Sequence, residues 1–203
     1  MGLEIELKFQ VSDFEGLRIK LLKAGASFVD RYFEQNLVLD TGSRELRQKD
    51  MLLRLRKARR SVLCLKRKPD PGTDPGTAME QEGFKVYSEM ETQVQDPEQM
   101  QAILQGLGFS PAFRYEKVRE KWQLQACLVC LDLLPFGRYV ELEGQDIMAC
   151  VRLLGLDPES GSSKTYHQLH QEHRQAQGWT AEESFVFTEA QKAQLIEQNP
   201  DLC

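Results

Sequence analysis

Residues 2–10 carry the pattern that most constrains how this chain folds. In the run GLEIELKFQ, Glu4, Glu6 and Lys8 alternate with apolar residues. Because a β-strand turns successive side chains to opposite faces, the three charges share one face and the apolar residues share the other. A single strand of this kind is typical of a sheet with one face in water. A different fold is indicated only if the same pattern recurs along the chain.

The same alternation recurs in six further segments, which place charged residues on one face and core residues on the other. They are MLLRLRK (51–57), VLCLKRK (62–68), FKVYSEMETQ (84–93), RYEKVREKW (114–122), LVCLDLL (128–134) and GRYVELEG (137–144). The charges are also sorted by sign, with acids at 4/6, 89/91 and 141/143 and bases at 54/56, 66/68 and 117/119. An ordinary solvated face mixes both signs, so the sorting favours a ligand site.

Amphipathic helices are predicted between and after the strands. Ser12 with Glu15 forms a capping-box pattern before a helix that ends at Gly25. Asp96 and Pro97 supply a cap and a first-turn proline for a second helix, which ends at Gly106 or Gly108. Further helices are expected at 146–154, 163–174 and 188–198.

These helices need an apolar sheet face to pack against, which leaves the charged face to line an interior. The predicted fold is therefore α+β, an eight-stranded antiparallel closed β-barrel or tunnel with a charged lumen and helices packed on the outside. The similar runs LLKAGASF and ILQGLGFS, each followed by strands, predict an internal duplication with pseudo-twofold symmetry.

Composition excludes several classes of partner. The net charge of -5 gives no global attraction for nucleic acid, and no apolar run approaches the ~20 residues that span a bilayer. No signal-peptide pattern precedes the first strand, and five cysteines, an odd number, suit a reducing compartment. We therefore expect a cytoplasmic protein, a monomer or homodimer, that binds neither nucleic acid nor membrane. Cys127 and Cys130 form a CxxC within a strand-like run, where they face opposite ways, which argues against a redox or metal role.

Six ordered motifs resemble those of the CYTH superfamily, the triphosphate tunnel metalloenzymes. They are ExExK at 4–8, LRLR at 53–56, a lysine at 66, KxR at 117–119, an aspartate at 132 and GRYVELE at 137–143. The superfamily includes class IV adenylyl cyclases, thiamine triphosphatases and inorganic triphosphatases. The resemblance covers residues 1–175 and implies an eight-stranded antiparallel tunnel there, with 176–203 a C-terminal helical extension packed on the same domain.

The resemblance also implies roles for individual residues. The divalent-metal ligands, for Mg²⁺ or Mn²⁺, would be Glu4, Glu6, Asp132, Glu141 and Glu143. The triphosphate would be bound by Lys8, Arg54, Arg56, Lys66, Arg119 and Lys164, the last on a helix near a tunnel mouth. The catalytic set would be Glu4, Glu6, Lys8, Arg56, Glu141 and Glu143, with Glu89 and Glu91 as candidates for a second metal. Tyr87 departs from the family, which usually has a basic residue before the ExE of the fifth strand.

Apart from any resemblance, this inventory suits a polyphosphate. Arg forks and Lys ammonium groups match phosphate oxygens, whereas carboxylates can face phosphate only through a hard divalent cation. The predicted function is metal-dependent hydrolysis of inorganic triphosphate, thiamine triphosphate or a nucleoside triphosphate. The alternatives are a class IV adenylyl cyclase, which forms cyclic AMP and pyrophosphate from ATP, and a non-catalytic triphosphate- or nucleotide-binding module. Without substrate, the buried acids and bases should pair with one another.

For three further features, the sequence favours a structural role over a functional one. The loop 69–83, rich in Pro, Gly and acid, suits an ordinary surface loop better than a lid over the tunnel. His167, His170 and His173 are expected on a solvated helix face rather than at a metal. Trp179, Phe185 and Phe187 are expected to dock the C-terminal helix.

Overall fold

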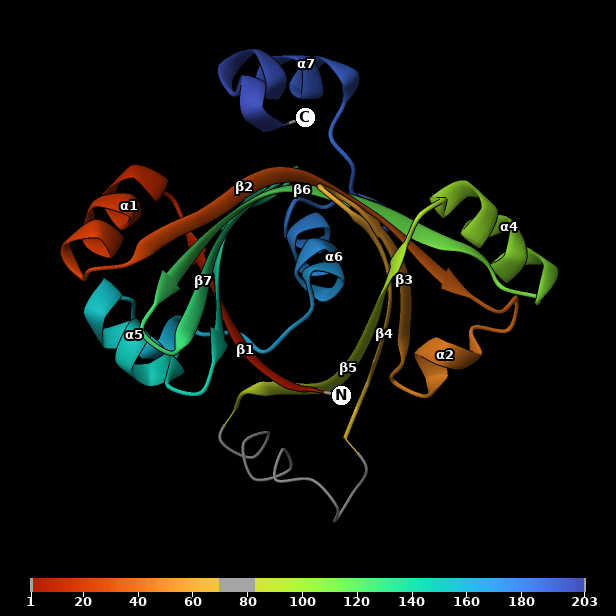
Figure 1. The fold of residues 1–203 in the computed structure, drawn as a ribbon, viewed down its shortest axis with the longest axis horizontal. Helices are drawn as coiled ribbons and strands as arrows, with labels where there is room; N and C mark the ends of the chain where they lie inside the picture. Colours follow the sequence, from red (N-terminus) through yellow and green to blue (C-terminus); the bar gives the residue numbers. More distant parts are fainter. Residues whose placement is uncertain (1, 70–82, 203) are drawn as a thin grey trace.

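Eight antiparallel strands close into a barrel in the computed structural model, which describes residues 2–69 and 83–202 (Figure 1). The order around the ring is β1-β5-β4-β3-β2-β6-β7-β8, and β8 pairs with β1 to complete it. This confirms the predicted closed antiparallel barrel. The strands are β1 (Gly2–Val11), β2 (Ser27–Asp40), β3 (Leu52–Lys57), β4 (Ser61–Arg67), β5 (Lys85–Val94), β6 (Ser110–Leu124), β7 (Cys127–Leu134) and β8 (Gly137–Gly144).

The ring order agrees with the predicted duplication. Replacing each of β1 to β4 by its equivalent in β5 to β8, and the reverse, gives the same ring read in the opposite direction. A twofold axis perpendicular to the barrel, passing between β1 and β5 and between β2 and β6, produces this result. The helix after β1 and the helix after β5 occupy equivalent places in the two halves.

The helices begin and end close to the predicted positions. They are α1 (Phe14–Lys23), α2 (Glu45–Gln48), α4 (Pro97–Gly106), α5 (Ile147–Leu154), α6 (Tyr166–Ala176) and α7 (Glu189–Gln198), with 3₁₀ turns η1 (Pro158–Ser160) and η2 (Pro200–Leu202). The predicted Ser12 cap is wrong, because Asp13 caps α1 by accepting from the Gly16 amide at 3.0 Å. Thr165 caps α6, so this helix starts three residues after the predicted Ser163.

Two apolar layers cover the outside of the barrel. Leu21 of α1 and Val151 of α5 pack with Leu7 and Phe9 of β1 on one flank (Figure 1). Leu104 of α4 packs with the outward leucines of β3 on the other flank. Burial of these side chains, each contributing roughly 1.5–3 kcal/mol, turns the opposite face of every strand toward the interior.

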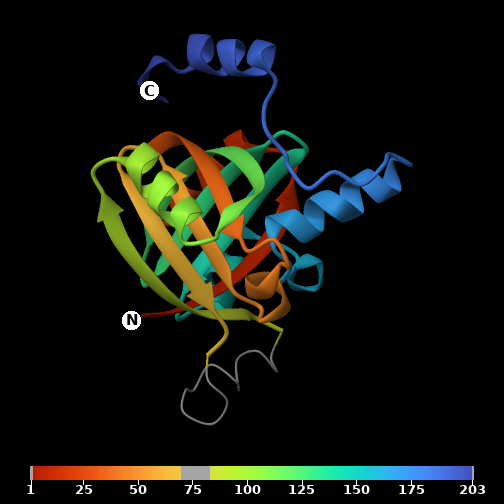
Figure 2. The same cartoon turned by 90° about the vertical axis from the view of Figure 1, so that its right-hand side faces the viewer.

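One helix departs from the prediction that all helices pack outside. Figure 2 shows α6 at one end of the barrel, opposite the end where the N-terminus lies, and Figure 1 shows it across the opening of the ring. The buried Tyr166 extends from the first turn of α6 into the lumen. The Tyr166 side chain thus forms part of the tunnel wall.

The C-terminal segment pairs with the backbone of β6 at Tyr115. The Phe185 amide donates to the Arg114 carbonyl at 3.0 Å, and the Phe187 amide donates to Glu116 Oε2 at 3.0 Å. Phe185 and Phe187 are buried, as expected for docking residues, whereas Trp179 is 56% exposed and packs on α6 instead. The division of the chain at residue 175 stays a prediction.

Two other predictions concern regions around the barrel. The loop 69–83, for which a lid over the tunnel was the alternative to a surface loop, lies mostly within 70–82, outside the described residues. Among the helices that the structure describes, none combines the length and the apolarity that crossing a bilayer demands.

Candidate active site

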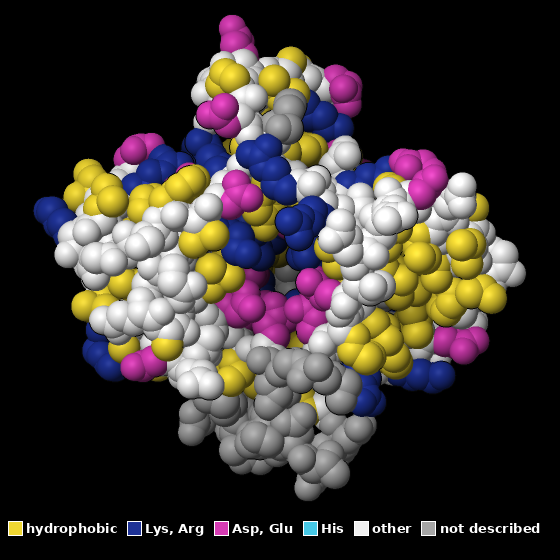
Figure 3. All heavy atoms as spheres, viewed as in Figure 1, with side chains coloured by type: hydrophobic (Ala, Val, Ile, Leu, Met, Phe, Trp, Pro, Cys, Tyr) yellow, Lys and Arg dark blue, Asp and Glu magenta, His cyan; other side chains and the backbone are white. Residues whose placement is uncertain are grey.

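The inward faces of the strands enclose a cavity of about 570 Å³. Figure 3 looks into its mouth, where Asp and Glu side chains gather on one side and Lys and Arg on the other. The charged residues that the strands contribute to the cavity wall are Glu4, Glu6, Lys8, Asp40, Arg54, Arg56, Lys66, Lys85, Glu89, Glu91, Lys117, Arg119, Lys121, Glu141 and Glu143. The segment around α2 adds Arg44, Arg47 and Asp50. This confirms the central expectation that the alternating charges share an interior.

The acidic side of the tunnel comes from two neighbouring strands. β1 and β8 pair with Glu6 opposite Glu143 and Lys8 opposite Glu141, so four charges form a compact patch. Directly opposed side chains in an antiparallel pair lie about 5 Å apart at their Cβ atoms. Glu4 adds a further carboxylate one lumen position along β1.

Most acids in this patch already hold a cation. Glu6 contacts both Lys8 and Lys85, and Lys8 also lies 3.2 Å from Glu141. Burial alone would raise the pKa of Glu6, but Lys8 and Lys85 outweigh it and lower the pKa to about 2. Lys66 pairs with Glu4. The expected pairing of lumen acids and bases is therefore confirmed.

Glu143 is the exception. Among the described residues it forms no ion pair, although it faces the same cavity. Burial, followed by the charges of Glu4 and Glu141, raises the pKa of Glu143 to about 7. Three carboxylates that repel one another around a cavity suit a hard divalent cation, which takes oxygen ligands and relieves the repulsion. The donor chemistry of Glu4, Glu141 and Glu143 therefore suits Mg²⁺ or Mn²⁺, although these three carboxylates are not among the described groups whose ligand atoms lie within 4.8 Å of one another, and their role as metal ligands stays a prediction.

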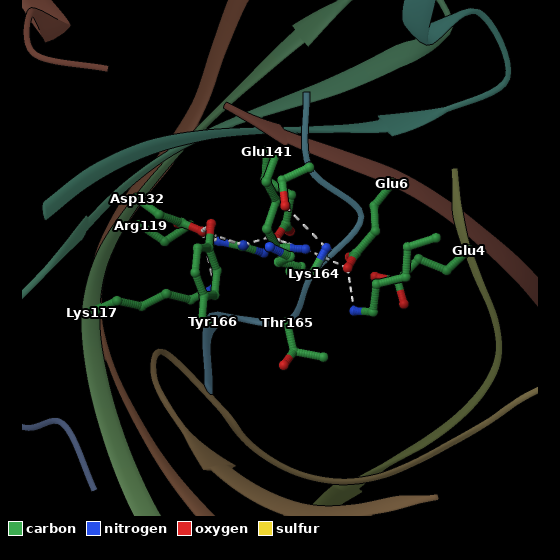
Figure 4. Close-up of polar contacts among 12 residues, drawn as sticks. Glu4, Glu6, Lys117, Arg119, Asp132, Glu141, Lys164, Thr165 and Tyr166 are labelled. Carbon is green, nitrogen blue, oxygen red and sulfur yellow. Dashed lines mark hydrogen bonds and ion pairs between the residues drawn. The ribbon is translucent and has the colours of Figure 1, made fainter. Parts of the chain in front are cut away.

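Asp132 has a different environment. Arg119 donates to its two oxygens at 2.7 and 2.5 Å, Lys117 lies 3.2 Å away, and the Tyr166 hydroxyl donates at 2.7 Å (Figure 4). The carboxylate is fully buried and is not exposed to the cavity. Asp132 thus lies on the inward face of β7, covered by Arg119, Lys117 and Tyr166. It positions Arg119 and Lys117, and its role as a metal ligand stays a prediction.

The arginines of β3 lie on the opposite side of the lumen. Arg54 donates to the Tyr115 hydroxyl at 2.8 Å, and Arg56 pairs with Glu91 at 3.1 Å. Glu89 accepts a hydrogen bond from the Cys64 thiol at 2.8 Å. Burial raises the pKa of that thiol to about 12, so it stays protonated near neutral pH.

Cys64, Glu89 and Glu91 could together hold a second metal ion, since their ligand atoms lie within 4.8 Å of one another. This grouping agrees with the choice of Glu89 and Glu91 as second-metal candidates, and it adds a sulfur ligand. A protonated thiol beside Arg54 is a poor ligand for a hard cation, so the chemistry of this group suits Mg²⁺ or Mn²⁺ less well than its geometry does.

Lys164 lies apart from the other predicted phosphate-binding residues. It precedes α6 rather than lying on it, is half exposed, and pairs with Glu172 at 2.6 Å. It is not among the residues that line the cavity. A phosphate role for Lys164 would require its side chain to leave Glu172.

Several tunnel residues were missed by the sequence prediction. Lys85 lies two residues before Tyr87 on the same inward face of β5 and supplies a basic group that Tyr87 lacks. The Lys85 ammonium lies 4.9 Å from the Tyr87 ring. Glu34 on β2 is fully buried, lies 3.7 Å from Lys117, and has its pKa lowered to about 2, as Lys117 and Arg119 outweigh burial. Tyr166 lies under Lys8 and Lys117, with each ammonium 5.2 Å from its ring.

The histidine prediction is wrong. His170 is buried against Phe136 and Phe185, and His167 packs 4.7 Å from Phe113 and bonds Glu183 at 2.9 Å. These histidines therefore form the packed face of α6 rather than a solvated one. The aromatic residues of β6 and of the C-terminal segment provide the surface that covers them.

A closed antiparallel tunnel with acids and bases facing one lumen defines the class of this protein, and the comparisons identify the family. The CYTH domain family matches residues 2–150, and the chain belongs to it. A Methanocaldococcus jannaschii protein named as a "putative adenylate cyclase" is 22% identical over 180 residues, covering 82% of this chain and 98% of that protein.

Two solved structures support the fold. A Vibrio parahaemolyticus protein described as a "putative adenylate cyclase" superposes with a TM-score of 0.68 at 17% identity, covering 83% of this chain and 97% of that one. A Hippeastrum protein, described as a "putative adenylyl cyclase" with a dominant triphosphatase activity, gives a TM-score of 0.57 at 17% identity, covering 89% and 98%. At these identities the likeness establishes the shared fold.

Proposed function

We propose that this protein hydrolyses a triphosphate-containing substrate in the tunnel with the help of Mg²⁺ or Mn²⁺. The observation that carries the proposal is Glu143, a carboxyl group beside Glu4 and Glu141 that faces the cavity with no cation of the described chain to neutralise it. A protein keeps such a costly group where a ligand supplies the missing charge.

The bases around the lumen suit the other half of the site. Arg56 and Lys66 reach the cavity from β3 and β4, and Lys121, which forms no ion pair among the described residues, reaches it from β6. A triphosphate carries about four negative charges, and Arg forks and Lys ammonium groups are the donors that match its oxygens. Substrate binding would exchange the ion pairs to Glu4 and Glu91 for phosphate contacts.

The chain's own residues account for positioning and charge stabilisation. Arg119 and Lys117 are held in place by Asp132, so they can meet phosphate oxygens without reorganising. Glu4, Glu141 and Glu143 would hold the divalent cation, which would supply positive charge beside the phosphates and a water of lowered pKa. Lys8, Arg54 and Arg56 then stabilise the charge that develops on the transferred phosphoryl group and on the leaving diphosphate.

The second candidate is an adenylyl cyclase, which is supported by the descriptions of the relatives from M. jannaschii and V. parahaemolyticus. The Hippeastrum protein carries that description together with triphosphatase activity, which favours hydrolysis as the first candidate. A non-catalytic binding module is the third. Oligomeric state and cellular location stay predictions.

The deciding experiment incubates the protein with Mg²⁺ or Mn²⁺ and, separately, tripolyphosphate, thiamine triphosphate or ATP. Hydrolysis releases orthophosphate, cyclisation releases pyrophosphate and cyclic AMP, and a binding module yields no product despite measurable affinity. Orthophosphate that appears only with metal supports the proposal, whereas cyclic AMP as the main product from ATP replaces it with the second candidate.

Arg56→Ala tests the phosphate-binding side. Because Arg56 faces the lumen opposite the acidic patch, its loss should weaken triphosphate binding by about tenfold and monophosphate binding much less. Calorimetric titration with each ligand measures both. Equal losses for the two ligands would contradict a triphosphate site at this wall.

A further inference from the structure

One carboxylate lies among the bases of the tunnel. Glu34 on β2 lies opposite Lys117 of β6 in the strand pairing, and its Oε1 is 3.7 Å from the Lys117 ammonium. The Glu34 side chain is fully buried and is not among the residues that line the cavity, whereas Lys117 is. Glu34 therefore lies behind the basic wall and can affect a ligand only through the side chains in front of it.

The neighbours of Glu34 come from the two strands that flank β2. One is β3, which turns Arg54 and Arg56 toward the cavity, and the other is β6, which turns Lys117 and Arg119 toward it. Burial alone would raise the pKa of Glu34, but these four cations, Lys117 and Arg119 most strongly, outweigh it and lower the pKa to about 2. The carboxylate is therefore ionised near neutral pH, and one negative charge lies behind four positive ones.

Hydrogen bonding does not explain why an acid occupies this position. Asn36 donates to Glu34 Oε1 at 2.9 Å, but Glu34 Oε2 has no hydrogen-bond partner among the described residues. Lys117 donates instead to Asp132 at 3.2 Å, and Arg119 donates to Asp132 at 2.7 Å. A buried carboxylate oxygen without a donor costs stability. Because Asp132 already holds the two cations of β6, the contribution of Glu34 to the site is its charge.

A negative charge behind the bases lowers the positive potential that an anionic ligand meets in the cavity. The interaction of that charge with a ligand grows with the charge of the ligand, so the effect is largest for a triphosphate and smallest for orthophosphate. The diphosphate left by hydrolysis is also a polyanion. A basic wall without Glu34 would therefore hold the product more tightly as well as the substrate.

We propose that Glu34 lowers the affinity of the tunnel for polyphosphates, and that it does so more strongly the more charge the ligand carries. The inference rests on the proposed function for the kind of ligand. Glu34 acts without touching that ligand, through the electrostatic potential of Lys117, Arg119, Arg54 and Arg56.

The test titrates tripolyphosphate, diphosphate and orthophosphate into wild type and Glu34→Gln in EDTA, where no metal-dependent turnover occurs. Glu34→Gln keeps the length of the side chain and an acceptor for Asn36 but removes the charge. Tripolyphosphate should bind about tenfold tighter and orthophosphate about threefold tighter or less, with diphosphate between them. A residue that only positioned Lys117 would give the opposite sign, because its loss would weaken binding.

Three further variants keep the result interpretable. Glu34→Asp retains the charge and should bind tripolyphosphate within about threefold of wild type. Glu34→Met also removes the charge and decides the matter if Glu34→Gln does not fold. Glu120→Gln is the matched control, since Glu120 is another buried acid, pairs with Arg18 of α1 at 2.8 Å outside the tunnel, and should leave all three affinities unchanged.

Two results would overturn the inference. One is unchanged or weaker binding of tripolyphosphate by the uncharged variants, and the other is a gain in affinity that is equal for all three ligands. Turnover of tripolyphosphate, thiamine triphosphate and ATP with Mg²⁺ tests the proposed function separately, and there Glu34→Gln should lower KM and kcat together because the product leaves more slowly. Absence of product with every triphosphate would remove hydrolysis, while the binding data still decide whether Glu34 sets the affinity.

Discussion

Two carboxylates of the barrel, the buried Asp132 and the half-buried Glu143, lie in opposite electrostatic environments. Asp132 on β7 receives donors from Arg119, Lys117 and Tyr166. Glu143 on the adjacent β8 receives none from the described residues and lies beside two other carboxylates. The first charge is neutralised within the protein, and the second is not.

The difference follows from position in the barrel. Asp132 lies opposite Arg119 in the β6–β7 pairing, and α6 covers it with Tyr166. Glu143 lies opposite Glu6 in the β1–β8 pairing, and the bases of β1 and β5 are already bound to Glu6. Strand register thus leaves one carboxylate paired with cations and the other beside further carboxylates.

Asp132→Asn should produce the largest change in stability. Removing this buried charge leaves Arg119 and Lys117 poorly compensated, and the free energy of unfolding should fall by about 3 kcal/mol or more. Urea denaturation measures the change, with Glu143→Gln as the matched control that should show no loss. Unchanged stability of Asp132→Asn together with lost metal-dependent turnover would break the comparison and support Asp132 as a metal ligand.

Glu143→Gln should have the largest effect on activity. With one oxygen ligand made neutral, metal-dependent turnover should fall by about a hundredfold or more while the protein stays folded. Measurements of kcat/KM over a Mg²⁺ and Mn²⁺ titration, with circular dichroism for folding, check this. Glu98→Gln, an exposed acid on α4, is the control. Undiminished turnover would remove Glu143 from the metal site.

Much of the barrel could be predicted from the sequence because alternation is a local property. Each of seven strands shows apolar and charged residues at period two, and closure follows from the need to cover the apolar faces with helices. The sequence analysis did not predict β2, because the polar Gln35 lies between Phe33 and Leu37 on the outward face and interrupts the apolar alternation. The inward positions of Glu34 and Asn36 were therefore not recognised. The order of polar residues in FEQNLVLD was the available signal.

The partners of the lumen residues could not be predicted, because they depend on register and on distant segments. Strand parity places Asp132, Glu141 and Glu143 on one face, but only the pairing with β6 gives Asp132 its arginine. Similarly, α6 has the amphipathic pattern of any surface helix, and its place at the tunnel end depends on Ser162, whose backbone pairs with Lys8 of β1.

The pH dependence of stability provides a sharper test of the uncompensated acid. The pKa of Glu143 is about 7 in the folded protein and 4.5 as the reference value, so the unfolded state loses its proton first as pH rises. The favourable contribution of the protonated group is complete below about pH 4.5 and is lost as pH rises through 7. Glu143→Gln should therefore be more stable than wild type at pH 8, by about 1–3 kcal/mol, with the difference vanishing near pH 4. Urea unfolding of both proteins without metal at these two pH values measures it, and an equal difference at both would contradict an ionisation effect.

Tyr166→Phe should have the smallest effect and tests the neutralised side of the comparison. The variant keeps the ring beneath Lys8 and Lys117 and removes only the hydroxyl that donates to Asp132. Since Arg119 still holds both oxygens of Asp132, the free energy of unfolding should fall by about 1 kcal/mol. Denaturation measures this, and Tyr139→Phe is a matched control on β8, because Tyr139 packs on Tyr166 through its ring. A loss as large as that of Asp132→Asn would mean that α6, rather than Arg119, holds this carboxylate in place.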